Sequence, residues 1–167
     1  MKKIISKKAI SCMLILVVLL SATAHAQAPS LSENLFKYAK SALKSLAAGD
    51  YQKVVTSLPF SGVSPSAKEW SSFVEGSFGS LSGDAPQTKY AVAYWTGKVW
   101  KVAVPLAEPD SKDVETFVLV SEDGSSFSGY GCSSWGNVSK EYQKSDYVRW
   151  NDEYNGSTSV VVEFDAD

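Results

Sequence analysis

The sequence predicts an α+β domain in which N-terminal helices pack on an antiparallel sheet, and three observations carry this prediction. The 167 residues are 44% apolar and 20% charged, which is typical of one globular domain. Apolar residues recur at helical spacing between residues 31 and 81. From Thr88 onward the pattern alternates and is rich in β-branched and aromatic residues, which favours strands. Helices followed by strands are typical of an α+β fold and not of repeated β-α-β units.

Start and stop signals divide the helical part into three segments. Residues 30–33 read S-L-S-E, which is a capping box and predicts that the first helix begins there. Gly49 is placed to end this helix, and Asp50 is placed to cap a short second helix that Pro59 ends. The third helix is expected to begin with Pro65 in its first position, where the missing N–H costs nothing.

The second half of the chain predicts a series of short strands. A turn around Gly97 joins the first two as a β-hairpin, and Asn155-Gly156 marks a later turn. Residues 131–144 show no clear pattern. The order leads to an antiparallel sheet with helices on one face. The expected strands are residues 90–95, 99–104, 114–120, 127–130, 147–150 and 159–164.

Residues 1–26 match the three parts of a secretory signal peptide. A segment with four lysines precedes an apolar run over residues 13–20, and Ala24-His25-Ala26 forms a cleavage box. We therefore expect export to the periplasm or the medium, no stable membrane insertion after cleavage, and one mature domain over residues 27–167. Cleavage removes the four lysines and no acidic residue, so the net charge changes from −2 to −6. This charge disfavours nucleic-acid binding.

Several short motifs resemble those of a known group of proteins. Residues 47–51 read A-A-G-D-Y between two short helices, the third helix is led by Trp70, and residues 115–130 contain E-T-F-V-L-V, D-G and G-Y. This arrangement resembles small exported bacterial domains of unknown function with an NTF2-like, or cystatin-like, cone. The resemblance covers about residues 31–131 and implies helices on a curved antiparallel sheet, but no established activity. The extension from about residue 132 has no counterpart in it.

The residue types needed for common catalytic sites are missing from the mature chain. The single histidine, His25, lies in the signal peptide, so neither a Ser-His-Asp site nor a His-ligated zinc site can form. Cys132 is followed three residues later by Trp135, where a nucleophile turn needs glycine, so a small buried thiol is the better interpretation. Asp113 and Glu115 are interpreted as solvated surface acids. We predict no catalytic residue, no metal and no cofactor.

Aromatic residues supply the candidate binding site. All twenty aromatic side chains (five Trp, eight Tyr, seven Phe) lie outside the signal peptide. Many must form the core, and core packing is the main alternative for each of them. The remainder is expected to line an aromatic pocket or patch at the open end of the cone. The candidate ligand-binding residues are Trp70, Tyr94, Trp95, Tyr130 and Trp135.

These observations predict an exported, non-catalytic binding module. Its partner would be a small apolar or sugar-like ligand or an envelope protein. One alternative is an enzyme of the isomerase or dehydratase kind that uses a buried carboxylate with a tyrosine. Another is a secreted inhibitor or immunity-type protein whose tail from Cys132 onward contacts the partner. An open sheet face rich in Trp and Val also predicts a homodimer.

Overall fold

The computed structural model describes residues 28–81, 90–106, 114–144 and 161–163, and it confirms the α+β class. The expected signal peptide, the expected strand at 147–150 and the turn at Asn155-Gly156 lie outside the described residues. The described helices are α1 (Asn34–Ala47), α2 (Tyr51–Ser57), α3 (Ala67–Phe78) and α4 (Trp135–Lys144). The described strands are β1 (Tyr90–Trp95), β2 (Trp100–Pro105), β3 (Glu115–Ser121), β4 (Gly129–Ser134) and β5 (Val161–Glu163). Among these helices, none combines the length and the apolar character needed to span a bilayer.

The strands form one antiparallel sheet in the order β4-β3-β2-β1-β5. The predicted hairpin between β1 and β2 is confirmed, with Trp95 paired opposite Trp100. Gly97 in its turn has φ +89°, which a residue with a side chain rarely adopts. Strands β1 to β4 therefore follow each other as a meander, and β5 returns to the free edge of β1.

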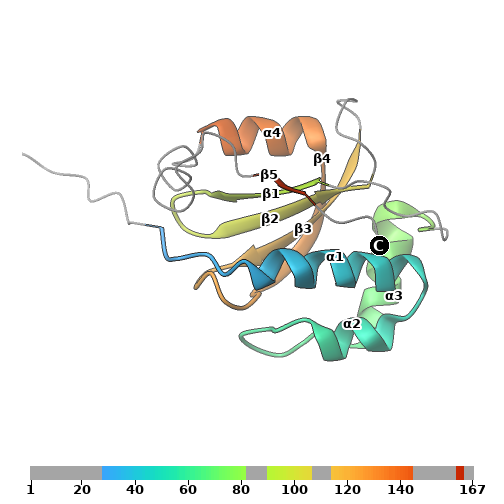
Figure 1. The fold of residues 1–167 in the computed structure, drawn as a ribbon. Coiled ribbons are helices and arrows are strands. Elements are labelled where there is room, and N and C mark those ends of the chain that lie inside the picture. The colour runs from blue at the N-terminus through green and yellow to red at the C-terminus, as the bar shows by residue number, and fades with distance from the viewer. Residues whose placement is uncertain (1–27, 82–89, 107–113, 145–160, 164–167) are drawn as a thin grey trace, which may run out of the picture.

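Helices cover both faces of this sheet (Figure 1). Helices α1, α2 and α3 lie on one side, whereas α4 packs across β1, β3 and β4 on the other. Alternation along β1 explains the division, because Trp95 faces the chain that leads into α1 while the neighbouring Tyr94 reaches Glu141 on α4. The prediction of helices on one face is wrong in this respect, since residues 135–144 form the fourth helix.

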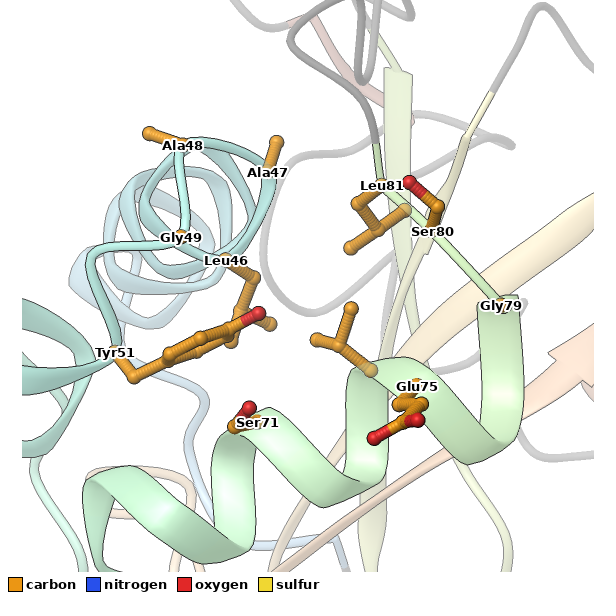
Figure 2. A pocket seen from close by; sticks show the side chains of 11 residues that line it. Leu46, Ala47, Ala48, Gly49, Tyr51, Ser71, Glu75, Gly79, Ser80 and Leu81 are labelled. Atoms are coloured by element: carbon orange, nitrogen blue, oxygen red, sulfur yellow. The ribbon is translucent and has the colours of Figure 1, made fainter.

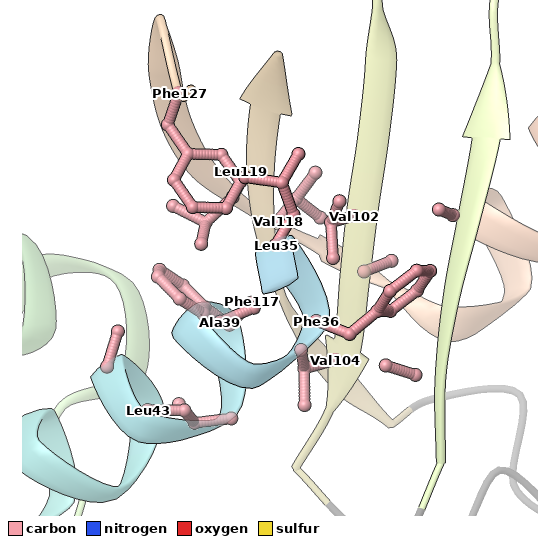
Figure 3. Packing of buried hydrophobic residues seen from close by; sticks show 14 of the residues in the cluster. Leu35, Phe36, Ala39, Leu43, Val102, Val104, Phe117, Val118, Leu119 and Phe127 are labelled. Carbon is pink, nitrogen blue, oxygen red and sulfur yellow. The ribbon is translucent and has the colours of Figure 1, made fainter. Parts of the chain in front are cut away.

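The main core lies between α1 and the sheet (Figure 3). Helix α1 buries a stripe at helical spacing, and the sheet meets it with alternate residues of β2 and β3. Burial of each large apolar side chain in this core contributes about 2 kcal/mol to the stability of the fold. The contacting residues include Leu35, Phe36, Ala39 and Leu43 from α1, with Val102, Val104, Phe117 and Leu119 from the sheet.

The chain before α1 is an extended N-terminal arm, residues 28–32, and not the start of a helix. The Trp100 indole N–H donates to the Pro29 carbonyl at 2.8 Å, and the Ser32 N–H donates to the Gly124 carbonyl at 2.7 Å. Helix α1 consequently begins at Asn34, and its N-cap Glu33 makes no side-chain capping bond. The predicted capping box at residues 30–33 is wrong because these long-range bonds hold the arm against the sheet.

The turn that receives this arm is closed by one carboxylate. Asp123 accepts hydrogen bonds from the N–H groups of Ser125 and Ser126, both at 2.8 Å, and from the Ser126 hydroxyl at 2.7 Å. Burial raises the pKa of Asp123, but these hydrogen bonds outweigh it and hold the pKa far below the ordinary value. The turn is thereby preorganised to accept the arm at Gly124.

Helix α3 begins later than predicted, at Ala67. Ser66 is the N-cap: its hydroxyl accepts from the Glu69 N–H at 3.3 Å, and the Glu69 carboxylate accepts from the Ser66 N–H at 2.7 Å. This capping box, S-A-K-E, satisfies two backbone donors at once and therefore outcompetes a start at Pro65.

Candidate functional site

An open cleft of about 500 Å³ lies where the end of α1, the start of α2 and the second half of α3 meet (Figure 2). Leu46, Val74 and Leu81 supply its apolar surface. The Tyr51 ring forms one wall. Its polar side chains are Ser71, Glu75 and Ser80, and the backbone of residues 47–49 and of Gly79 completes the lining.

Two glycines create the opening by ending helices abruptly. Gly49 has φ +71° and ends α1, after which Asp50 caps α2 by accepting the Lys53 N–H at 3.2 Å. Tyr51 is therefore the first residue of α2 and faces back across the gap. Gly79 has φ +68° and ends α3 on the opposite side. The A-A-G-D-Y segment thus builds the corner of the cleft.

Two of the predicted ligand-binding residues, Trp70 and Tyr130, lie together on the face of the sheet that α1, α2 and α3 cover. Their ring centroids are 4.2 Å apart, and Phe73 and Phe117 pack edge-on against Trp70. Trp70 is fully buried, and its indole N–H has no hydrogen-bond partner within the described chain. This pair is part of the hydrophobic packing and does not line the cleft.

The structure places the other predicted residues elsewhere. Tyr94 and Trp135 both approach Tyr142 of α4, at centroid distances of 6.1 and 6.4 Å. Trp95 packs on Trp100 at 5.5 Å, on the face that receives the N-terminal arm. The five residues are therefore distributed over both faces of the sheet, and none of them lines the cleft. Sequence reasoning did not single out Tyr51 or Glu75 as site residues, although it placed the A-A-G-D-Y segment at the junction of the first two helices.

A polar cluster beneath α4 combines a carboxylate with a tyrosine. The buried Tyr94 hydroxyl donates to the Glu141 carboxylate at 3.0 Å, and Lys101 forms an ion pair with the same carboxylate. The Lys101 bond, together with Tyr94, lowers the pKa of Glu141, while burial raises the pKa of Tyr94 well above its ordinary value. Both shifts move the pKa values away from neutral pH, where general acid–base catalysis is most effective. The cluster instead fastens α4 to the sheet.

Cys132 and Glu115, two further residues that the sequence analysis considered for catalysis, lie apart from the cleft. Cys132 lies on β4 and is exposed, so the prediction of a buried thiol is wrong: its strand is at the edge of the sheet. Glu115 is exposed at the start of β3, and Asp113 lies outside the described residues. Within the described ranges, no group of three or more His, Cys, Asp or Glu side chains is arranged to hold a metal ion.

Comparisons with known proteins add no relative. No protein-family model, curated protein or solved structure matches the chain.

Proposed function

We propose that this protein is an exported, non-catalytic binding module that holds a small sugar-like ligand in the cleft between α1, α2 and α3. The observation that carries the proposal is the cleft itself. Its volume of about 500 Å³ falls in the range of small-molecule sites, about 300–1,000 Å³. It also combines an apolar surface with hydroxyl and carboxylate groups, which such sites use to orient a ligand.

The composition of the lining favours a sugar over a purely apolar molecule. A sugar ring presents C–H groups that pack on an aromatic face, as the Tyr51 ring allows, and hydroxyls that Ser71, Glu75 and Ser80 can bind. A purely apolar ligand would offer these polar groups no hydrogen bonds, and each group that it shielded from water would cost about 1–3 kcal/mol. Of the two ligand classes that the sequence predicts, the sugar-like class therefore fits the cleft.

Two finer expectations belong to the same proposal. The succession of three helices and a four-strand meander supports an NTF2-like, cone-shaped domain. The three-part pattern of residues 1–26 supports export. Expression in a bacterial host followed by intact-mass measurement tests the export proposal. The mature protein should begin at Gln27 and leave the cytoplasm, and an uncleaved cytoplasmic chain would refute it.

The binding proposal is tested by titrating the isotope-labelled full protein with three monosaccharides: glucose, glucosamine and glucuronate. We expect at least one of them to shift backbone amide signals concentrated in residues 46–51 and 71–81. Tyr51→Ala should abolish these shifts, whereas Tyr38→Ala should preserve them because Tyr38 is an exposed residue of α1 outside the cleft. Circular dichroism confirms that both variants fold. Shifts that are absent, or that survive Tyr51→Ala, would refute the proposal.

A further inference from the structure

We infer that the ligand of this cleft carries a positive charge, so that it is an amino sugar or a similarly sized organic ammonium compound. This inference rests on the proposed function and specifies its ligand class. It is drawn from three sources of negative potential around one cleft: the C-terminal ends of α1 and α3, which line it, and the carboxylate of the exposed Glu75 on the α3 wall.

The end of α1 forms one wall of the cleft with its backbone. Residues 47–49 are Ala-Ala-Gly, so their side chains cover little of the peptide groups. The N–H groups of Ala48, Gly49 and Asp50 bond the carbonyls of residues 44–46, and the carbonyls of Ala47 and Ala48 take no part in these bonds. The last carbonyls of a helix carry about half a negative charge. A cation in the cleft would therefore meet the negative end of α1.

The opposite wall has the same sign of potential. Helix α3 ends at Gly79, which also lines the cleft with its backbone. Glu75, one turn earlier, lies exposed at the rim, and its carboxylate has no hydrogen-bond or ion-pair partner among the residues that the structure describes. An unpaired carboxylate beside two helix C-termini favours an ammonium group and disfavours a carboxylate or phosphate.

Among the residues that the structure describes, nearby groups of positive potential do not cancel this field. The N-terminus of α2 also borders the cleft, but α2 has only seven residues, and the Asp50 carboxylate caps it. Lys44 is the basic residue in the last turn of α1, and it is not among the residues that line the cleft. The ring of Tyr51 lies beside the end of α1, and the face of an aromatic ring attracts cations.

The test compares two sugars that differ in this charge. Glucosamine is titrated against N-acetylglucosamine at about pH 6, below the ordinary pKa of an α-amino group, so that only glucosamine is charged. From exposed ion-pair and helix-end contributions, we expect glucosamine to bind about tenfold more tightly. Glu75→Gln should reduce this preference to about threefold, since the helix ends remain. Glu122→Gln, which removes the same charge from the β3–β4 turn, should leave it unchanged.

Each outcome has a distinct meaning. Equal binding of the two sugars at the cleft, or a preference that Glu75→Gln leaves unchanged, would overturn the charge inference while the proposed function stands. Binding of neither sugar, and of none of the monosaccharides above, would overturn both. The wild-type protein gives an independent measurement. Raising the salt concentration should weaken the binding of glucosamine and leave N-acetylglucosamine unaffected, and the opposite result would overturn the inference.

Discussion

Replacing Gly124 with alanine should destabilise the protein strongly. This glycine gives the turn its positive φ, and it also contacts the N-terminal arm. Its φ is +73°, and a Cβ built on it would lie 2.2 Å from the Ser30 carbonyl oxygen. The side chain therefore cannot be accommodated by rotamer changes, since the nearest atoms belong to the backbone of the arm. Either the turn or the arm must move.

The loss in the free energy of unfolding can be summed from the backbone strain and from the contacts that the displaced arm loses. The backbone strain of a non-glycine residue at this φ costs about 1–2 kcal/mol. Losing the bond from the Ser32 N–H to the Gly124 carbonyl costs about 1 kcal/mol. Partial exposure of Leu31, which is 1% exposed in the folded protein, adds about 1–2 kcal/mol. We expect a total of about 4 kcal/mol, a large part of the stability of a small domain.

Urea unfolding followed by tryptophan fluorescence measures this loss. Gly97→Ala is the matched control, because Gly97 has φ +89° but no described atom lies within 4 Å of a Cβ built there. It should therefore show the strain alone, about 1–2 kcal/mol. Equal losses in the two variants would refute the reasoning, because they would mean that the arm does not pack on the turn.

Three further predictions concern the core and the α4 cluster, and urea unfolding measures each of them. Trp70→Ala should lower the free energy of unfolding by about 3–5 kcal/mol. Trp70→Phe should lower it by only about 1 kcal/mol, because the indole N–H has no partner to lose within the described chain. Similar losses in the two variants would contradict this reasoning. Tyr94→Phe should cost about 1 kcal/mol through the lost bond to Glu141, and an unchanged unfolding midpoint would refute that bond. Glu141 has a lowered pKa in the folded state, so its contribution is present above the ordinary glutamate pKa and lost as the pH falls through the lowered value. The stability difference between wild type and Glu141→Gln should therefore shrink on acidification, and a difference that grows would contradict the ion pair.

Features with a local cause were predictable from the sequence. The β1–β2 hairpin depends on Gly97 and on alternation within a dozen residues, and α1 depends on a continuous apolar stripe. The S-x-x-E capping pattern at Ser66 is also present in the sequence, but the helix was predicted to begin at Pro65, two residues too early. Local signals compete where two lie close together, and here the one that satisfies more backbone donors determines where the helix begins.

Features with a long-range cause were not predictable. The N-terminal arm is held by a bond between Pro29 and Trp100, which are 71 residues apart. Helix α4 has only a thin apolar stripe that includes Val138, and it contains a glycine, so packing on the sheet and the Glu141 cluster decide its conformation.

The cleft depends on how three helices are placed relative to one another, and no single segment encodes that placement. The A-A-G-D-Y segment could be read as a sharp helix–helix turn. Nothing in it indicates that α3 ends opposite, where Glu75 and Gly79 complete the lining. The predicted aromatic residues were chosen for their type, and in the structure they lie in or against the hydrophobic core.

A crystal structure of the mature protein grown with glucosamine would show directly whether the cleft binds an amino sugar. We expect a sugar ring in the cleft, stacked on Tyr51, with its ammonium nitrogen within about 4 Å of the Glu75 carboxylate, the distance of an ion pair. An empty cleft at saturating glucosamine, or a sugar bound on another surface, would contradict it.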